Sequence, residues 1–127
     1  FPDLKIFVNG GITRVEDCHN HLNFVDGVMI GRQAYHHPWF LTKLEAEFGI
    51  KDWSPSRLDI IEKMIPYMKK EMIFGTPLKK LVRPMFGLFS GQPGARAWRR
   101  YLSENAFKRD ADIDVIYQSL EKLNLAF

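Results

Sequence analysis

Two short glycine turns, each placed after an apolar run, constrain the fold of this chain most strongly. The run Lys5–Val8 leads into the turn Asn9–Ile12, and the run Gly27–Ile30 leads into the turn Gly31-Arg32. Runs that are apolar without alternation are typical of parallel strands buried on both faces. We therefore expect two buried strands, each followed by a turn and a helix, as at the end of a parallel α/β sheet.

The two turns predict a phosphate cradle. Glycine lets the backbone approach a ligand and present bare N–H groups to it, and the N-terminus of a following helix favours an anion. Thr13 is the expected cap of the first helix, with Glu16 completing a capping box. In (β/α)8 barrels a cradle of this kind follows strands seven and eight. The residues assigned to the cradle are Asn9, Gly10, Gly11, Gly31 and Arg32.

Helices are predicted for most of the remaining chain, so the expected fold class is mainly α. A short helix over Arg32–His36 and a longer one over Pro38–Phe48 precede a linker, Ile50–Ser54, which we interpret as a domain boundary. Cap–proline pairs then begin helices at residues 54 and 76. Pro66 predicts a kink in the first of these helices.

Two further helices complete a predicted four-helix domain with short, antiparallel connections. The third is expected from about Ala95 to Phe107, with Trp98 on its buried face. Asp110 or Asp112 is the expected cap of the last helix. The predicted core face of that helix consists of Ile113, Ile116, Tyr117, Leu120 and Leu123.

Charge is distributed unevenly along the chain. Residues 75–109 hold eight Lys or Arg and one acidic residue, whereas residues 1–74 and 110–127 carry net charges of −1 and −3.

Arg96, Arg99 and Arg100 share one helix face at i, i+3 and i+4, where like charges repel. Phosphates would relieve that repulsion, so the block predicts a polyanion-binding surface. The alternative is a solvated face, or ion pairs with Glu104 and the acidic C-terminal residues. The weaker candidates for this surface are Lys79, Lys80 and Arg83.

The cysteine and the histidines carry no predicted chemistry. Cys18 is the single cysteine, which excludes an internal disulfide and suggests a reducing compartment. A lone thiol within a helix is usually a small hydrophobe rather than a nucleophile. His19 and His21, and the adjacent His36 and His37, lack the i, i+4 spacing of a helical metal site, so no metal is expected.

Three stretches resemble the tRNA-dihydrouridine synthases, and the A subfamily in particular. Residues 9–12 and 25–35 are similar to the region that binds the FMN phosphate, and residues 87–105 are similar to the C-terminal helical domain. The run from Trp98 to Asn105 is the most specific of these. The resemblance implies a cytoplasmic, flavin-dependent oxidoreductase that reduces D-loop uridines of tRNA to 5,6-dihydrouridine, with NADPH as the reductant of FMN.

The resemblance also implies that this chain is the C-terminal part of a longer enzyme. Residues 1–50 are then the end of a TIM barrel that carries the FMN-phosphate turns, and residues 51–127 are a helical tRNA-binding domain. In the family, most flavin contacts and the catalytic cysteine precede this region. We therefore expect the isolated chain to be inactive, to bind FMN weakly or not at all, and to self-associate through bare strand edges or to be disordered over residues 1–40.

Two alternatives remain open from the sequence. The chain could be a non-catalytic helical module that binds RNA or a protein. It could also belong to a flavin barrel of the dihydroorotate-dehydrogenase kind that acts on a small molecule, although such a substrate needs no exposed basic helix.

Overall fold

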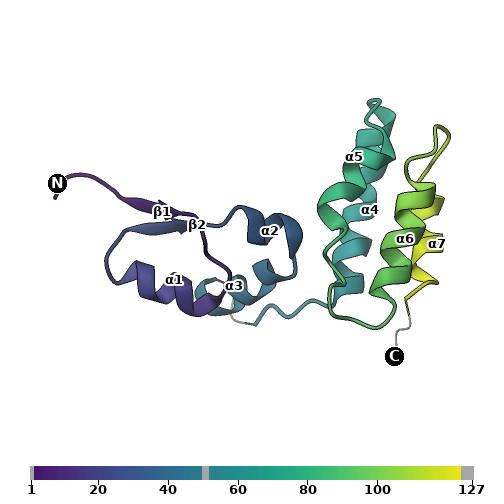
Figure 1. Ribbon diagram of the computed structural model, residues 1–127. Helices are drawn as coiled ribbons and strands as arrows, with labels where there is room; N and C mark the ends of the chain where they lie inside the picture. The colour runs from purple at the N-terminus through teal and green to yellow at the C-terminus, as the bar shows by residue number, and fades with distance from the viewer. Residues whose placement is uncertain (1, 50–51, 124–127) are drawn as a thin grey trace. The chain divides into compact units, whose positions relative to one another are not determined.

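The computed structural model describes residues 2–49 and 52–123, and the chain divides into two compact units, Phe1–Ser54 and Pro55–Phe127. We call them the N-terminal unit and the helical unit. Helices predominate in the chain (Figure 1), which confirms the mainly α prediction. Within the described ranges, no helix combines the length and the hydropathy that crossing a bilayer requires.

The N-terminal unit is built on a pair of parallel strands. Its elements, in chain order, are β1 (Phe7–Asn9), α1 (Val15–Leu22), β2 (Gly27–Met29), α2 (Arg32–His36) and α3 (Phe40–Phe48). Val8 of β1 lies opposite Val28 of β2. The parallel pairing follows from the strand–turn–helix order, because a parallel return needs a crossover connection, which α1 supplies here.

Two side chains set the register of the strand pair. The ring of Phe7 occupies the space that a Cβ atom at Gly27 would need, so a side chain at position 27 would displace this ring. The carboxylate of Asp26 accepts a hydrogen bond from the backbone N–H of Ile6 at 2.8 Å. Asp26, which directly precedes β2, therefore ties the start of β2 to the residue before β1.

The prediction that both strands are buried on both faces is wrong for this structure. Ile6, Phe7 and Met29 are 50, 66 and 55% exposed. Each strand has one strand neighbour among the described residues, and a two-stranded sheet leaves every strand an open edge. The apolar composition of these strands suits a larger sheet with both faces covered.

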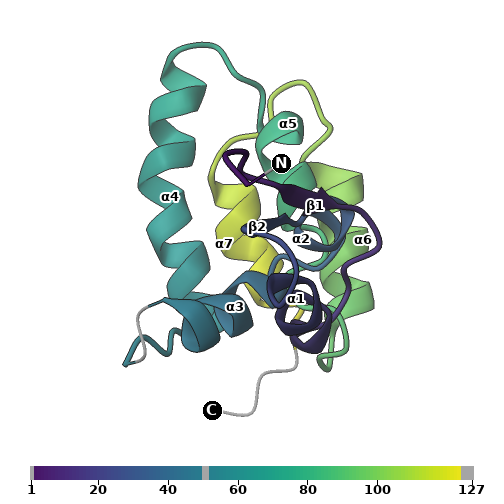
Figure 2. The ribbon, with the colours of Figure 1, turned by 90° about the vertical axis from the view of Figure 1, so that its left-hand side faces the viewer.

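The helical unit contains α4 (Arg57–Ile73), α5 (Leu78–Val82), the 3-10 turn η1 (Arg83–Met85), α6 (Ala95–Asn105) and α7 (Asp114–Leu120). Helix α4 continues through Pro66 as one helix (Figure 2). Ser56, rather than the predicted Ser54, caps this helix. Its hydroxyl accepts from the Asp59 N–H at 3.1 Å, and the Asp59 carboxylate accepts from the Ser56 N–H at 2.8 Å. This reciprocal pair places the helix start after Pro55.

Trp98 lies at the centre of the core of the helical unit. It is fully buried, as predicted, and meets the buried ring of Phe89 edge-on at 4.8 Å between centroids. Leu88 and Phe89, both buried, come from the glycine-rich connection before α6. The side chain of Arg57 donates to the Leu88 carbonyl at 2.8 Å and holds this connection against α4.

The core face of α7 differs from the prediction at two positions. Ile116 and Leu123 are buried as expected, but Tyr117 is 47% exposed and Ser119 is fully buried in its place. The helix begins at Asp114, where the Asp112 carboxylate accepts from the Asp114 N–H at 2.9 Å. Asp112, one of the two predicted caps, therefore supplies a hydrogen bond at the N-terminus of α7.

Candidate functional site

A pocket of about 640 Å³ lies where β1 and β2 end in the N-terminal unit. The carboxyl ends of parallel strands meet at one edge of a sheet, which explains why both glycine turns reach it. All five residues assigned to the phosphate cradle line this pocket. Its full lining is Asn9, Gly10, Gly11, Ile12, Thr13, Met29, Gly31, Arg32, Gln33, His36 and His37.

The first turn requires glycine for its backbone. Gly10 has φ +119° and Gly11 has φ +69°, conformations that side chains other than glycine adopt only with strain. No protein atom lies within 4 Å of a Cβ position at Gly10, Gly11 or Gly31. Open space therefore faces the backbone at all three glycines, and a ligand could approach the main chain closely there.

The second turn brings positive charge and unsatisfied donors to the pocket. Arg32 is exposed, and no ion pair to it occurs among the described residues. No side chain caps α2, and no acidic residue lies in its first turn. Helix α2 has only five residues, so its dipole is weak. Anion binding at this turn would rest on the backbone N–H groups and on the guanidinium of Arg32.

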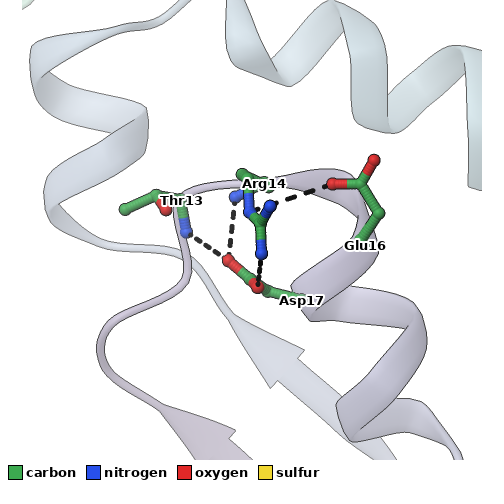
Figure 3. Close-up of polar contacts among 4 residues, drawn as sticks. All are labelled: Thr13, Arg14, Glu16 and Asp17. Atoms are coloured by element: carbon green, nitrogen blue, oxygen red, sulfur yellow. Dashed lines mark hydrogen bonds and ion pairs between the residues drawn. The ribbon is translucent and has the colours of Figure 1, made fainter.

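The N-terminus of α1 is already occupied by the protein's own carboxylate (Figure 3). Asp17 accepts hydrogen bonds from the backbone N–H groups of Thr13 at 3.2 Å and Arg14 at 3.1 Å. The Arg14 guanidinium lies 3.4 Å from the same carboxylate and 3.9 Å from that of Glu16. The prediction that Thr13 and Glu16 form the cap is therefore wrong, because Asp17 is the residue that returns to the start of the helix.

This self-capping changes how the pocket can bind an anion. The hydrogen bond from the Thr13 N–H is the main cause that lowers the pKa of Asp17, so this carboxylate is ionised at neutral pH. A negative charge at the start of α1 disfavours a second anion there. The side of the pocket formed by Gly31 and Arg32 is electrostatically the better place for a phosphate.

Six lining residues were not assigned to the cradle from the sequence: Ile12, Thr13, Met29, Gln33, His36 and His37. The two histidines were considered only as metal ligands, for which their spacing is wrong. Arg32 and His36 are four residues apart in one helix and so share a face. That spacing was the signal that could have placed His36 beside the cradle.

Cys18 has the structural role that the sequence analysis favoured. It is fully buried in α1, and burial raises the pKa of its thiol, which keeps it protonated. Among residues 2–49 and 52–123, no group of three His, Cys, Asp or Glu side chains is arranged to hold a metal ion.

The six basic residues of the predicted polyanion surface occupy different surroundings in the helical unit. Lys79, Lys80 and Arg96 are exposed, and Arg99 is half-buried. Arg100 makes an ion pair with Glu104 at 3.0 Å, which is one of the alternatives that the sequence left open. The guanidinium of Arg83 lies over the ring of Phe107, 5.7 Å from its centroid.

The topology separates Lys79 and Lys80 from Arg96. Helix α5 begins at the end of the unit where α6 ends, as both Figure 1 and Figure 2 show. Lys79 and Lys80 are the second and third residues of the five-residue helix α5, whereas Arg96 lies in the first turn of α6. Lys79 and Lys80 therefore lie toward the opposite end of the helical unit from Arg96.

Comparison with known proteins identifies the family. The family model described as Dihydrouridine synthase (Dus) matches residues 1–124. The chain belongs to the dihydrouridine synthase family. This membership confirms the family resemblance noted in the sequence.

Three relatives of this dihydrouridine synthase chain show how much of a longer protein it covers. All three are named tRNA-dihydrouridine(20/20a) synthase. The protein from Vibrio cholerae is 44% identical over 124 residues, which are 97% of this chain and 38% of the relative. Those from Escherichia coli K12 and Shewanella oneidensis are each 46% identical, over 95% of this chain and 35 and 37% of the relative. The chain thus spans little more than a third of the length of the relatives it matches.

Proposed function

We propose that this chain is the C-terminal part of an A-subfamily tRNA-dihydrouridine synthase. In this proposal the N-terminal unit is the end of a TIM barrel, and the helical unit binds tRNA. The observation that carries the proposal is a family match over residues 1–124 together with relatives named for tRNA dihydrouridine synthesis. The reaction is the reduction of D-loop uridines to 5,6-dihydrouridine.

The pocket residues fit the phosphate group of FMN. Their chemistry is that of an anion site, with three glycines that leave the backbone open, the amide of Asn9 and the guanidinium of Arg32. When bound, FMN supplies the hydride for the uracil ring after its own reduction by NADPH. The role of this chain is to hold the phosphate. Arg32 neutralises its charge, and the backbone N–H groups at Gly31 and Arg32 fix its position.

The helical unit supports tRNA binding through its unpaired cations. Arg96 and Arg99 lie on α6, and neither makes an ion pair among the described residues. Folded RNA is recognised mainly through backbone phosphates and shape. Arg96 and Arg99 are therefore the principal phosphate contacts in this proposal. Arg100 contributes less to phosphate binding in this proposal, because it already forms an ion pair with Glu104.

A titration with inorganic phosphate, followed by amide NMR of the full chain, tests the cradle. The expected result is saturable shifts at the amides of Gly10, Gly11, Gly31 and Arg32, lost in Arg32→Ala. The matched control is Lys43→Ala, which removes an exposed cation of the same unit outside the pocket. Shifts that are absent, or equal in both variants, would contradict the assignment of the cradle.

An activity assay tests the proposal that the hydride-transfer site lies outside this chain. The chain, incubated with unmodified tRNA, FMN and NADPH, is expected to form no dihydrouridine, because the proposal places the hydride-transfer site outside it. Dihydrouridine detected by mass spectrometry of the tRNA would contradict that placement. Retention of stoichiometric yellow flavin by the purified chain would contradict the expected weak binding of FMN.

A further inference from the structure

Two large apolar side chains project into solvent where α4 turns into α5. Ile73 is 83% exposed and Phe74 is 75% exposed. Among the described residues of the helical unit, no other large apolar side chain is as exposed. A single exposed apolar residue is ordinary, but two adjacent ones at a turn mark a candidate contact surface.

Hydrogen bonds hold this turn in one conformation. The N–H of Phe74 bonds to the Lys70 carbonyl at 3.3 Å, and that of Gly75 bonds to the Met72 carbonyl at 3.0 Å. Gly75 adopts φ +99°, which ends the helix. Thr76 bonds to Glu71 twice, from its N–H to the carbonyl at 3.0 Å and from its hydroxyl to the carboxylate at 3.4 Å. The Phe74 ring is thus carried on an ordered turn.

Exposed lysines flank the two apolar side chains on both helices. Lys69 precedes Ile73 by four residues and Lys70 precedes Phe74 by four, so each lysine shares a helix face with one apolar residue. Two more lysines lie in the five-residue helix α5, which follows the turn. All four are exposed and without an ion pair among the described residues. We call Ile73, Phe74 and these lysines the α4–α5 tip; its lysines are Lys69, Lys70, Lys79 and Lys80.

We propose that the α4–α5 tip binds an unpaired nucleotide of an RNA, with the Phe74 ring stacked on the base and the lysines on the neighbouring phosphates. The inference rests on the proposed function, which makes tRNA the RNA concerned. An exposed aromatic ring among cations is the arrangement by which proteins bind unstacked bases and their backbone. Two apolar side chains on a turn are too few to anchor a protein in a bilayer, where a whole helix face is normally required.

The tip is a different site from the arginines on α6. Arg96 lies in the first turn of α6, at the end of the unit opposite the start of α5. The two sites differ in chemistry as well. The arginines offer charge and planar hydrogen-bonding groups, whereas the tip adds an aromatic ring on which an unpaired base can stack.

Binding measurements with the full chain test this inference. The probes are an unmodified tRNA transcript, a fully paired RNA duplex and vesicles containing phosphatidylserine. The variants are Phe74→Ala, Phe74→Trp and the matched control Tyr117→Ala, which removes another exposed aromatic side chain of the same unit. Circular dichroism melts establish that all variants fold, as expected for exposed positions.

Phe74→Ala is expected to weaken tRNA binding about tenfold, the size of one lost base stack. Phe74→Trp keeps the parent affinity because it keeps the ring, and Tyr117→Ala changes it less than twofold. Binding to the duplex is expected to be the same for all variants. Equal tRNA affinity of Phe74→Ala and the parent would overturn the inference. An equal loss of tRNA affinity in Phe74→Ala and Phe74→Trp would also overturn it.

Two further outcomes separate this inference from the proposed function. If tRNA binding depends on Arg96 and Arg99 but not on Phe74, the inference fails and the proposed function stands. If the chain binds no tRNA, the tRNA-binding role of the helical unit fails and the inference fails with it. Vesicle binding that Phe74→Ala abolishes, without an effect on tRNA, would identify the tip as a membrane contact instead.

Discussion

The indole N–H of Trp98 donates a hydrogen bond to the hydroxyl of Ser119 at 3.1 Å, and both side chains are fully buried. The Ser119 hydroxyl in turn donates to the Ile116 carbonyl at 2.6 Å. This chain of bonds joins α6 to α7 through the centre of the helical unit. It also explains how a large aromatic side chain with a polar atom can occupy the core without leaving that atom unsatisfied.

Ser119→Ala is expected to destabilise the helical unit by about 1–3 kcal/mol, because it leaves the buried Trp98 N–H without an acceptor. Urea unfolding followed by tryptophan fluorescence measures the change. Ser103→Ala, at an exposed position on α6, is the matched control and should change the free energy of unfolding little. A negligible decrease in the free energy of unfolding of Ser119→Ala would show that the Trp98–Ser119 hydrogen bond does not stabilise the fold.

Gly11→Ala is expected to destabilise the N-terminal unit by about 1 kcal/mol through backbone strain at φ +69°. A side chain at this position meets no protein atom within 4 Å, so a steric clash would not contribute. Gly11→Asn should destabilise the N-terminal unit less than Gly11→Ala does, because asparagine tolerates this backbone conformation better. Thermal melts of the two variants check the order, and equal stability of Gly11→Ala and the parent would contradict the turn geometry.

The Asp17 carboxylate should make the stability of the N-terminal unit dependent on pH. Its pKa is lowered in the folded state, so its contribution is present above the unfolded value of about 3.9 and is lost as the pH falls below it. Asp17→Asn is therefore expected to lower the melting temperature at pH 7 and to differ less from the parent at acidic pH. Glu16→Gln, whose carboxylate is largely exposed, is the control. A difference between Asp17→Asn and the parent that does not depend on pH would contradict this assignment.

The exposed apolar residues of the strand pair support the prediction that the chain self-associates, and this prediction can be tested. Ile6 and Met29 are each at least half exposed on a two-stranded sheet, and bare strand edges pair readily with other chains. Sedimentation velocity over a wide concentration range should show association of the chain. Ile6→Lys, which places a charge at the edge, should reduce it. A sharp monomer peak at all concentrations would contradict the prediction.

The pocket was predictable from the sequence because its geometry follows from topology. Strand–turn–helix units in series make parallel strands, and parallel strands end at one edge, so the Gly10 and Gly31 turns had to meet. The apolar stripes of the helices were predictable for a similar reason, since their spacing is set by the helix period. Trp98 and Ile116 lie where that period placed them.

Other features depend on contacts that the sequence pattern does not encode. Asp17 rather than Thr13 determines the start of α1, because the capping carboxylate comes from one turn inside the helix. Ser119 is buried because Trp98 needs an acceptor, a requirement that arises only when two helices meet. Phe89 enters the core from a glycine-rich connection whose path is set by tertiary packing. The exposure of Phe7 reflects how many layers cover the sheet, which a strand's own composition cannot show.

Binding of unmodified tRNA to the chain across a salt series, from about 50 to 200 mM, tests the central claim most directly. The comparison is between the parent, an Arg96/Arg99/Arg100 triple alanine variant, and a Lys5/Lys43/Lys63 triple alanine control of equal charge. The account predicts steeply salt-dependent binding that the arginine variant loses and the lysine control retains. Binding that is absent, or that falls equally in both variants, would contradict the assignment of the helical unit as a tRNA-binding domain.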